Sequence, residues 1–147
     1  MRKLFWMLLL VVLGGLILFF EPFRGAPPEP EVTVNKTTLE TTSGSYCWQS
    51  LLRGQCVDYI YTTPLEMTAK QKPTRVEPGA KIHVVYSDGP TPSQIKTEEW
   101  QTGGEHRTIK LTNDQLTVPS KKGLYTYHVS SKWKKGDGNV AFSVEVK

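Results

Sequence analysis

The sequence predicts an all-β domain that follows one N-terminal apolar helix. Residues 4–20 contain no charged or strongly polar side chain. Beyond residue 30, no stretch of ten or more residues repeats apolar side chains with the 3.6-residue period of a helix. There, β-branched and aromatic residues alternate instead in short runs between Gly, Pro, Asn and Asp. Alternation with a period of two is typical of strands that bury one face.

The apolar segment at residues 4–20 is predicted to be a transmembrane signal anchor. As a helix, these 17 residues would span about 25 Å, close to the roughly 30 Å of a hydrocarbon core. Two basic residues precede the segment, so the positive-inside bias leaves residues 1–3 as a cytoplasmic stub and places the remainder outside the cell membrane. A cleaved secretory signal is the alternative, but Arg24-Gly25-Ala26 followed by Pro27 is a poor cleavage site.

The next ten residues, 21–30, read EPFRGAPPEP and contain four prolines. Proline excludes a continuing helix and favours extended geometry, which predicts a stiff linker up to roughly 30 Å long. Residues 31–147 are then expected to form a single extracytoplasmic β domain.

Short strand-like runs follow the linker. Seven of them are expected to be strands, the second and third paired as a hairpin: residues 31–38, 45–48, 56–61, 81–87, 95–101, 107–111 and 115–118.

The last two runs give the clearest strand pattern. Apolar side chains recur on one face of each: Tyr125, Tyr127, Val129 and Trp133 in the first, and Val140, Phe142, Val144 and Val146 in the second. Residues 134–139, KKGDGN, have turn chemistry, which predicts an antiparallel hairpin. Seven or more short strands separated by such turns indicate a β-sandwich.

Composition and charge bear on one class of partner, nucleic acid. The chain has 18 basic and 14 acidic residues, a net charge of +4, and its basic residues are scattered. This balance argues against a nucleic-acid partner. The densest basic stretch, residues 132–135, is interpreted as a solvated turn, with contact to an anionic envelope polymer or lipid surface as the alternative.

The only two cysteines, Cys47 and Cys56, are separated by eight residues. Outside the cell, an even count at short spacing predicts a disulfide. Closing such a loop stabilises the fold by roughly 2 to 3 kcal/mol in the chain-entropy model. A redox-active pair would be spaced C-x-x-C, and two cysteines without a nearby histidine cannot complete a zinc site.

Catalytic chemistry finds no support in the sequence. The three histidines, His83, His106 and His128, lie in separate runs, and no nucleophile elbow, phosphate loop or zinc-protease motif is present. Glu98 and Glu99 are adjacent, so in a strand their side chains point to opposite faces and cannot act as a catalytic pair. We therefore expect no enzyme activity, no cofactor and no metal.

Candidate binding residues lie around the cysteine pair: Trp48, Leu52 and Asp58. Trp48, Leu51 and Leu52 fall within or beside the cross-linked loop. They either pack beneath it or form an exposed apolar patch for a partner, and packing is the favoured interpretation.

Two resemblances extend this reading. Residues 77–84, EPGAKIHV, and residues 122–127, KGLYTY, resemble the core strands of bacterial immunoglobulin-like domains. This resemblance covers about residues 70–147 and implies an immunoglobulin-like sandwich. It leaves residues 31–69 as a hairpin region that contains the disulfide. Residues 44–48, GSYCW, followed by Cys56-Val57-Asp58, resemble a signature of small exported proteins of Bacillus-type bacteria, many of them lipoproteins, although this chain has an apolar helix where those carry a lipidated cysteine.

The sequence thus predicts a membrane-anchored binding module for an envelope protein or a cell-wall polymer. An accessory or structural subunit of an envelope membrane complex is the first alternative, and a carbohydrate-active hydrolase is a minor one.

Overall fold

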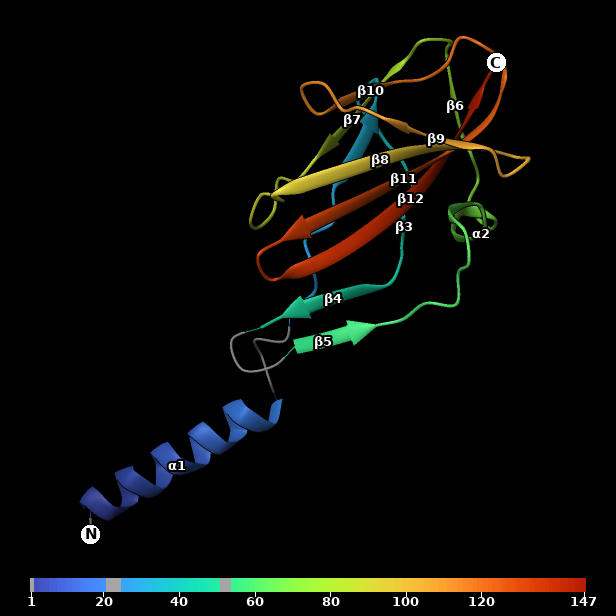
Figure 1. Cartoon of the computed structure of the whole chain (residues 1–147). Helices are drawn as coiled ribbons and strands as arrows, with labels where there is room; N and C mark the ends of the chain where they lie inside the picture. Colours follow the sequence, from blue (N-terminus) through green and yellow to red (C-terminus); the bar gives the residue numbers. More distant parts are fainter. Residues whose placement is uncertain (1, 21–24, 51–53) are drawn as a thin grey trace.

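The structure, a computed structural model, describes residues 2–20, 25–50 and 54–147, and only the backbone of residues 17–20. Two β-sheets make up the domain, and helix α1 precedes it in the chain (Figure 1). Nearly all strand pairs are antiparallel, which confirms the predicted β architecture.

The smaller sheet has four strands in the spatial order β10, β7, β1, β2. Their bounds are β1 (Glu31–Val34), β2 (Thr37–Thr38), β7 (Lys81–Val85) and β10 (Gln115–Thr117).

The larger sheet has eight strands, of which six follow one another in the order β5, β4, β12, β11, β8, β9. Their bounds are β4 (Tyr46–Gln49), β5 (Gly54–Val57), β8 (Gln94–Gln101), β9 (His106–Ile109), β11 (Gly123–Trp133) and β12 (Gly136–Val146). Two short strands, β3 (Thr42–Ser43) and β6 (Thr74–Val76), pair separately with β12, and β6 does so in parallel.

The hairpin of β11 and β12 forms the centre of the larger sheet. The sequence predicted this hairpin, but the turn is shorter than the six residues, 134–139, that were expected. Pairing continues to Trp133 opposite Gly136, so the turn consists of Lys134 and Lys135. Gly136 allows this tight turn. Its φ is +150°, and a Cβ there would lie 2.0 Å from the carbonyl oxygen of Cys47 on the neighbouring strand.

The core lies between the facing sides of the two sheets. The buried side chains of the smaller sheet and its adjoining loops meet the buried side chains of β11 and β12: Val32, Val34, Leu39, Ile82, Val84, Leu116 and Val118 on one side, and Tyr125, Tyr127, Val129, Val140, Phe142, Val144 and Val146 on the other. The predicted one-sided alternation of the last two strands is therefore correct. At roughly 25 cal/mol per Å² of apolar surface, this burial is the main stabilising contribution.

Part of the outer face of the larger sheet is also covered. Helix α2 (Pro64–Thr68) contacts β11 and β12, and Thr126 and Ser143 on the outward side of those strands are buried. The sequence places Thr63 at the N-cap, where its side chain accepts a hydrogen bond from the Glu66 N–H, and Pro64 at the first turn. The helix has only five residues, too short for a helical period to be visible in the sequence.

The first and third predicted strands differ from the structure. Asn35 and Lys36 both have positive φ, 47° and 66°, so they form a two-residue turn that divides the expected strand 31–38 into β1 and β2. The expected strand 56–61 ends at Val57, and the residues after it leave the sheet.

The second half of the predicted linker lies against the domain. Pro30 is buried, and the Ser43 hydroxyl donates a hydrogen bond to the Glu29 carboxylate. A Cβ on Gly138 would lie only 2.9 Å from Pro27. Residues 25–30 are therefore packed against the domain. The stiff spacer that was expected over residues 21–30 does not include this second half.

Helix α1 (Arg2–Phe20) covers the whole segment that was predicted to be an anchor. Within the described residues, no helix meets the combination of length and apolarity that crossing a bilayer requires. The predicted span at residues 4–20 stays a prediction.

Candidate functional site

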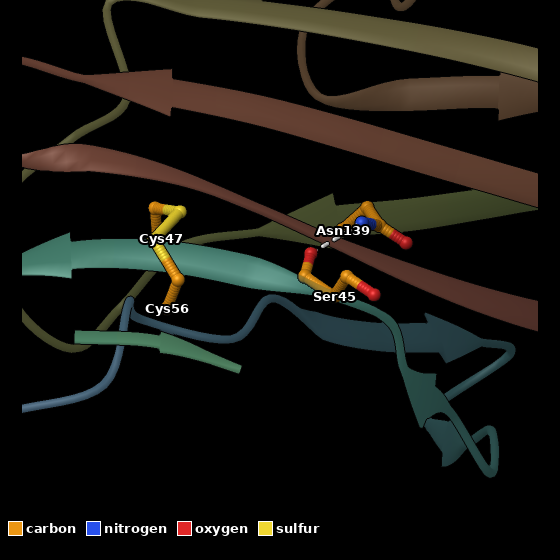
Figure 2. The surroundings of a disulfide bond; sticks show 4 residues. All are labelled: Ser45, Cys47, Cys56 and Asn139. Carbon is orange, nitrogen blue, oxygen red and sulfur yellow. Dashed lines mark hydrogen bonds between the residues drawn. A yellow bond between two sulfur atoms is a disulfide. The ribbon is translucent and has the colours of Figure 1, made fainter. Parts of the chain in front are cut away.

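The two cysteines form the predicted disulfide across the β4–β5 hairpin (Figure 2). Cys47 and Cys56 lie directly opposite each other in the strand register, and both are exposed on the surface. Among the described residues, strand β5 pairs with β4 alone. The cross-link therefore holds an edge strand that few core contacts support.

Trp48 lies in an aromatic cluster and is 7% exposed. Its ring meets the ring of Trp133 edge-on at 5.4 Å, and Trp133 meets Tyr86 at 5.5 Å. The Trp133 indole N–H donates to the carbonyl of Pro90 at 2.7 Å. Trp48 thus packs within the domain, as the favoured interpretation proposed, and a role in binding stays a prediction.

The other two candidate binding residues give less information. Leu52 lies outside the described residues. Asp58 is exposed immediately after β5, at the start of a segment that the sequence reading assigned to a strand.

Residues 59–61, which follow Asp58, expose three consecutive large side chains. Ile60 is fully exposed, Tyr59 and Tyr61 are 45% and 42% exposed, and the two tyrosine rings stack on each other at 6.1 Å. The Tyr59 N–H donates to the Ser45 hydroxyl oxygen at 2.9 Å, which fixes the start of the segment beside β4. Sequence reasoning missed this surface because it counted residues 56–61 as a strand. Successive side chains of a strand point to opposite faces, so three consecutive large apolar residues cannot all be buried on one face. The sequence therefore contained a signal for this exposed surface.

A pocket of about 190 Å³ adjoins Tyr61 on the outer face of the larger sheet. His128 and Asn139 line it, together with residues that connect β5 to α2. His128 Nε2 lies 3.1 Å from Asn139 Oδ1, and the Asn139 amide donates to the Ser45 carbonyl at 2.8 Å, the hydrogen bond drawn in Figure 2. These contacts hold the polar side chains of the pocket in place.

Glu98 completes this network from the neighbouring strand β8. Its carboxylate lies 3.4 Å from His128 Nδ1 and 2.6 Å from the Lys96 ammonium. The Lys96 hydrogen bond lowers the pKa of Glu98, and the His128 contact acts in the same direction against the opposing effect of burial. His128 lies on the outer face of β11, opposite its core-facing neighbours Tyr127 and Val129, and its carboxylate partner was not foreseen from the sequence.

Glu99 points the other way, into the core, as the alternation argument predicted. It is 2% exposed, accepts a hydrogen bond from Arg107 Nε at 2.9 Å, and accepts another from the Tyr127 hydroxyl at 3.3 Å. The carboxylate raises the pKa of the Arg107 guanidinium, and burial together with the Glu99 charge raises the pKa of Tyr127. The two adjacent carboxylates therefore share no site.

The other histidines lie elsewhere. His83 is exposed on the smaller sheet, and His106 stacks on Trp100 at 4.1 Å on β9 and β8. Within the residues that the structure describes, no three His, Cys, Asp or Glu side chains are close enough to hold a metal ion.

A scan against protein-family models and searches of curated proteins and of solved structures found no match for this chain. The site must therefore be interpreted from its own geometry. It combines an exposed aromatic and aliphatic segment with a small pocket lined by hydrogen-bonded polar side chains, an arrangement suited to binding a partner surface.

Proposed function

We propose that the protein is a membrane-anchored, extracytoplasmic binding module without catalytic activity, and that it binds its partner through Tyr59, Ile60 and Tyr61 beside the His128 pocket. The observation that carries this proposal is the exposure of residues 59–61. Outside α1, the described chain exposes five large apolar residues, and three of them are consecutive here. A contiguous exposed apolar segment is unusual on a monomeric domain and is typical of an interaction surface.

The anchor is supported by the sequence and side-chain exposure of α1. Eleven large apolar side chains between Leu4 and Leu16 are exposed, and no face of the described part of the helix packs on the domain. A helix that is apolar all round is stable only when lipid or other protein covers it. Two basic residues before it and a disulfide in the domain that follows agree with a cytoplasmic N-terminus and an oxidising exterior for the domain.

We also infer that the domain is of the immunoglobulin-like type. Strands β1, β7 and β10 form one sheet, whereas β12, β11, β8 and β9 form the other, with β6 added in parallel to β12. The Tyr125 hydroxyl donates to the Lys121 carbonyl at 2.9 Å, near the start of β11. A tyrosine in the penultimate strand that bonds to the backbone a few residues upstream is a hallmark of immunoglobulin-like sandwiches.

The binding surface is tested by Ile60→Asp in the full-length chain. The side chain is already exposed, so we expect folding to be unchanged, while a charge at the centre of an apolar contact should weaken binding at least tenfold. Crosslinking in native membranes followed by mass spectrometry identifies the partner and measures its recovery.

The matched control is Val85→Asp, which places the same charge on an exposed apolar residue of the smaller sheet. It should leave partner recovery unchanged. Equal recovery for both variants and the wild type, with the disulfide formed in each, would exclude residues 59–61 as the binding surface.

The alternative is an accessory subunit that contacts its complex through α1, since the same exposed side chains would fit against other transmembrane helices. Replacing residues 4–20 with an unrelated membrane-spanning sequence distinguishes the two. Recovery of the partner by the exchanged protein supports binding through the domain, whereas its loss supports the accessory role.

A further inference from the structure

The packed part of the linker limits how far the domain can lie from α1. Gly25 lies against Trp48, since a Cβ on Gly25 would be 3.3 Å from the Trp48 indole nitrogen. Gly25 follows Phe20, the last residue of α1, by five positions. A fully extended chain of five residues reaches at most about 18 Å. The end of the domain that contains Trp48 is therefore always within about 18 Å of the end of α1.

Two lysines lie at this end of the domain. Lys134 and Lys135 form the β11–β12 turn, and the Gln49 N–H, next to Trp48, donates to the Lys135 carbonyl at 2.7 Å. Both lysines are exposed, and neither forms an ion pair with another described residue. A groove of about 420 Å³ separates them from the disulfide.

A third lysine and one acidic residue border the same groove. Lys132 lies opposite Asp137 in the hairpin register. With three lysines and one aspartate along its border, the groove has a net positive charge. The positive end of the domain is thus the end at which Gly25 lies, five residues after α1.

We infer that Lys134 and Lys135 dock this end of the domain on anionic lipid headgroups of the bilayer that holds α1. The inference rests on the proposed membrane anchor. Each lysine near an anionic surface favours contact by about fivefold, and the short tether keeps both lysines near the surface at high effective concentration.

Docking also orients the proposed binding segment. Strand β4 runs toward the lysine turn, and β5 runs away from it because the two strands are antiparallel. Residues 59–61 follow β5 and lie toward the opposite end of the sheet, where α2 begins (Figure 1). The lysine contact therefore holds the exposed tyrosines and Ile60 away from the lipid and open to a partner.

The experiment is lysine acylation footprinting of the full chain in vesicles. The protein is reconstituted into phosphatidylcholine vesicles with or without about one third phosphatidylglycerol, and mass spectrometry measures the acylation rate of each lysine. We expect the anionic lipid to slow acylation of Lys134 and Lys135 by about fivefold or more. Lys121 and Lys122 precede β11 at its other end and serve as internal controls whose rates should not change.

A matched pair of variants tests the charge directly. In the wild type, docking should also slow the acylation of Lys132, which borders the same groove. K134E/K135E should abolish this dependence of Lys132 acylation on lipid charge. K121E/K122E, with the same change in net charge, should leave the protection of Lys134 and Lys135 intact.

Protease treatment of the same vesicles separates the two proposals. If residues 4–20 are protected and Lys134 and Lys135 react equally in both lipids, the docking inference is wrong and the anchor stands. If residues 4–20 are digested, both are wrong. If a soluble polyphosphate protects the two lysines in neutral vesicles while phosphatidylglycerol does not, the site binds an anionic polymer, and the lipid assignment is overturned.

Discussion

Glu98 and Glu99 are neighbours in the chain but have opposite environments. Glu98 lies on the outer face of the larger sheet, where an exposed lysine and His128 contact it beside the pocket. Glu99 lies on the inner face, where Tyr127 contacts it within the core and the largely exposed Arg107 reaches it from the edge strand β9. The alternation of a strand therefore decides which carboxylate lies on the outer face of the sheet and which one lies in the core.

The same contrast holds for the two faces of β11 and β12. Their inner residues are almost completely buried against the smaller sheet, whereas only some of their outer residues are buried, among them Thr126 and Ser143. Substitutions on the inner face should consequently affect stability, and substitutions on the open part of the outer face should affect binding.

The largest effect is expected for Phe142→Ala. The ring is fully buried and stacks on Tyr127 at 5.4 Å. Its removal leaves a cavity and should lower the free energy of unfolding by about 3 to 5 kcal/mol, measured by urea denaturation. Val85→Ala, at an exposed position, should change it by less than about 0.5 kcal/mol. A loss for Phe142→Ala as small as that control would contradict the assignment of the core.

An intermediate effect is expected for Arg107→Ala. The variant leaves the Glu99 carboxylate buried without its charged partner and should destabilise the domain by about 3 kcal/mol. Glu99→Gln in the same background should recover part of that loss, because the buried group is then neutral. The same denaturation measurement checks both variants, and a double variant no more stable than Arg107→Ala alone would show that unpaired charge is not the cause.

The smallest effect is expected for Lys96→Met on the outer face. Its pair with Glu98 is partly exposed, with 56% of the lysine side chain accessible, and should contribute only about 0.5 kcal/mol. Because the folded pKa of Glu98 is lowered from 4.5, this contribution is present in full above about pH 4.5 and is lost as pH falls through the folded pKa. Unfolding curves of wild type and variant between pH 3 and 7 measure it.

Lys110→Met is the control for that pH dependence, since Lys110 is exposed just beyond β9. A difference between wild type and Lys96→Met that grows toward low pH would have the opposite sign and would contradict the pairing.

Several structural features could be predicted because they depend on local pattern. The hairpin of residues 123–146 follows from uninterrupted alternation, and the Cys47–Cys56 bridge follows from spacing and a predicted exterior location. The inward position of Glu99 follows from its place next to Glu98. The turn at Asn35 and Lys36 was missed, although asparagine favours positive φ and gave a local signal for it.

The candidate site was less predictable because its parts are far apart in the chain. His128 and Asn139 come from β11 and β12, and Ser45 comes from the link between β3 and β4, so the three meet only after the larger sheet has formed. Nothing in the sequence indicates that α2 covers one end of the outer face and leaves the tyrosine segment open, since a five-residue helix has no measurable period.

The sequence by itself determined the apolar leading segment, the β character of the domain, its cross-linked hairpin and the faces of its longest strands. Each of these follows from composition or from periodicity within one segment. Only the tertiary structure decided that residues 25–30 pack on the domain, that Trp48 is enclosed and Ile60 exposed, and that Glu98 meets His128. These outcomes depend on the free energy of contacts between distant residues, which no single segment contains.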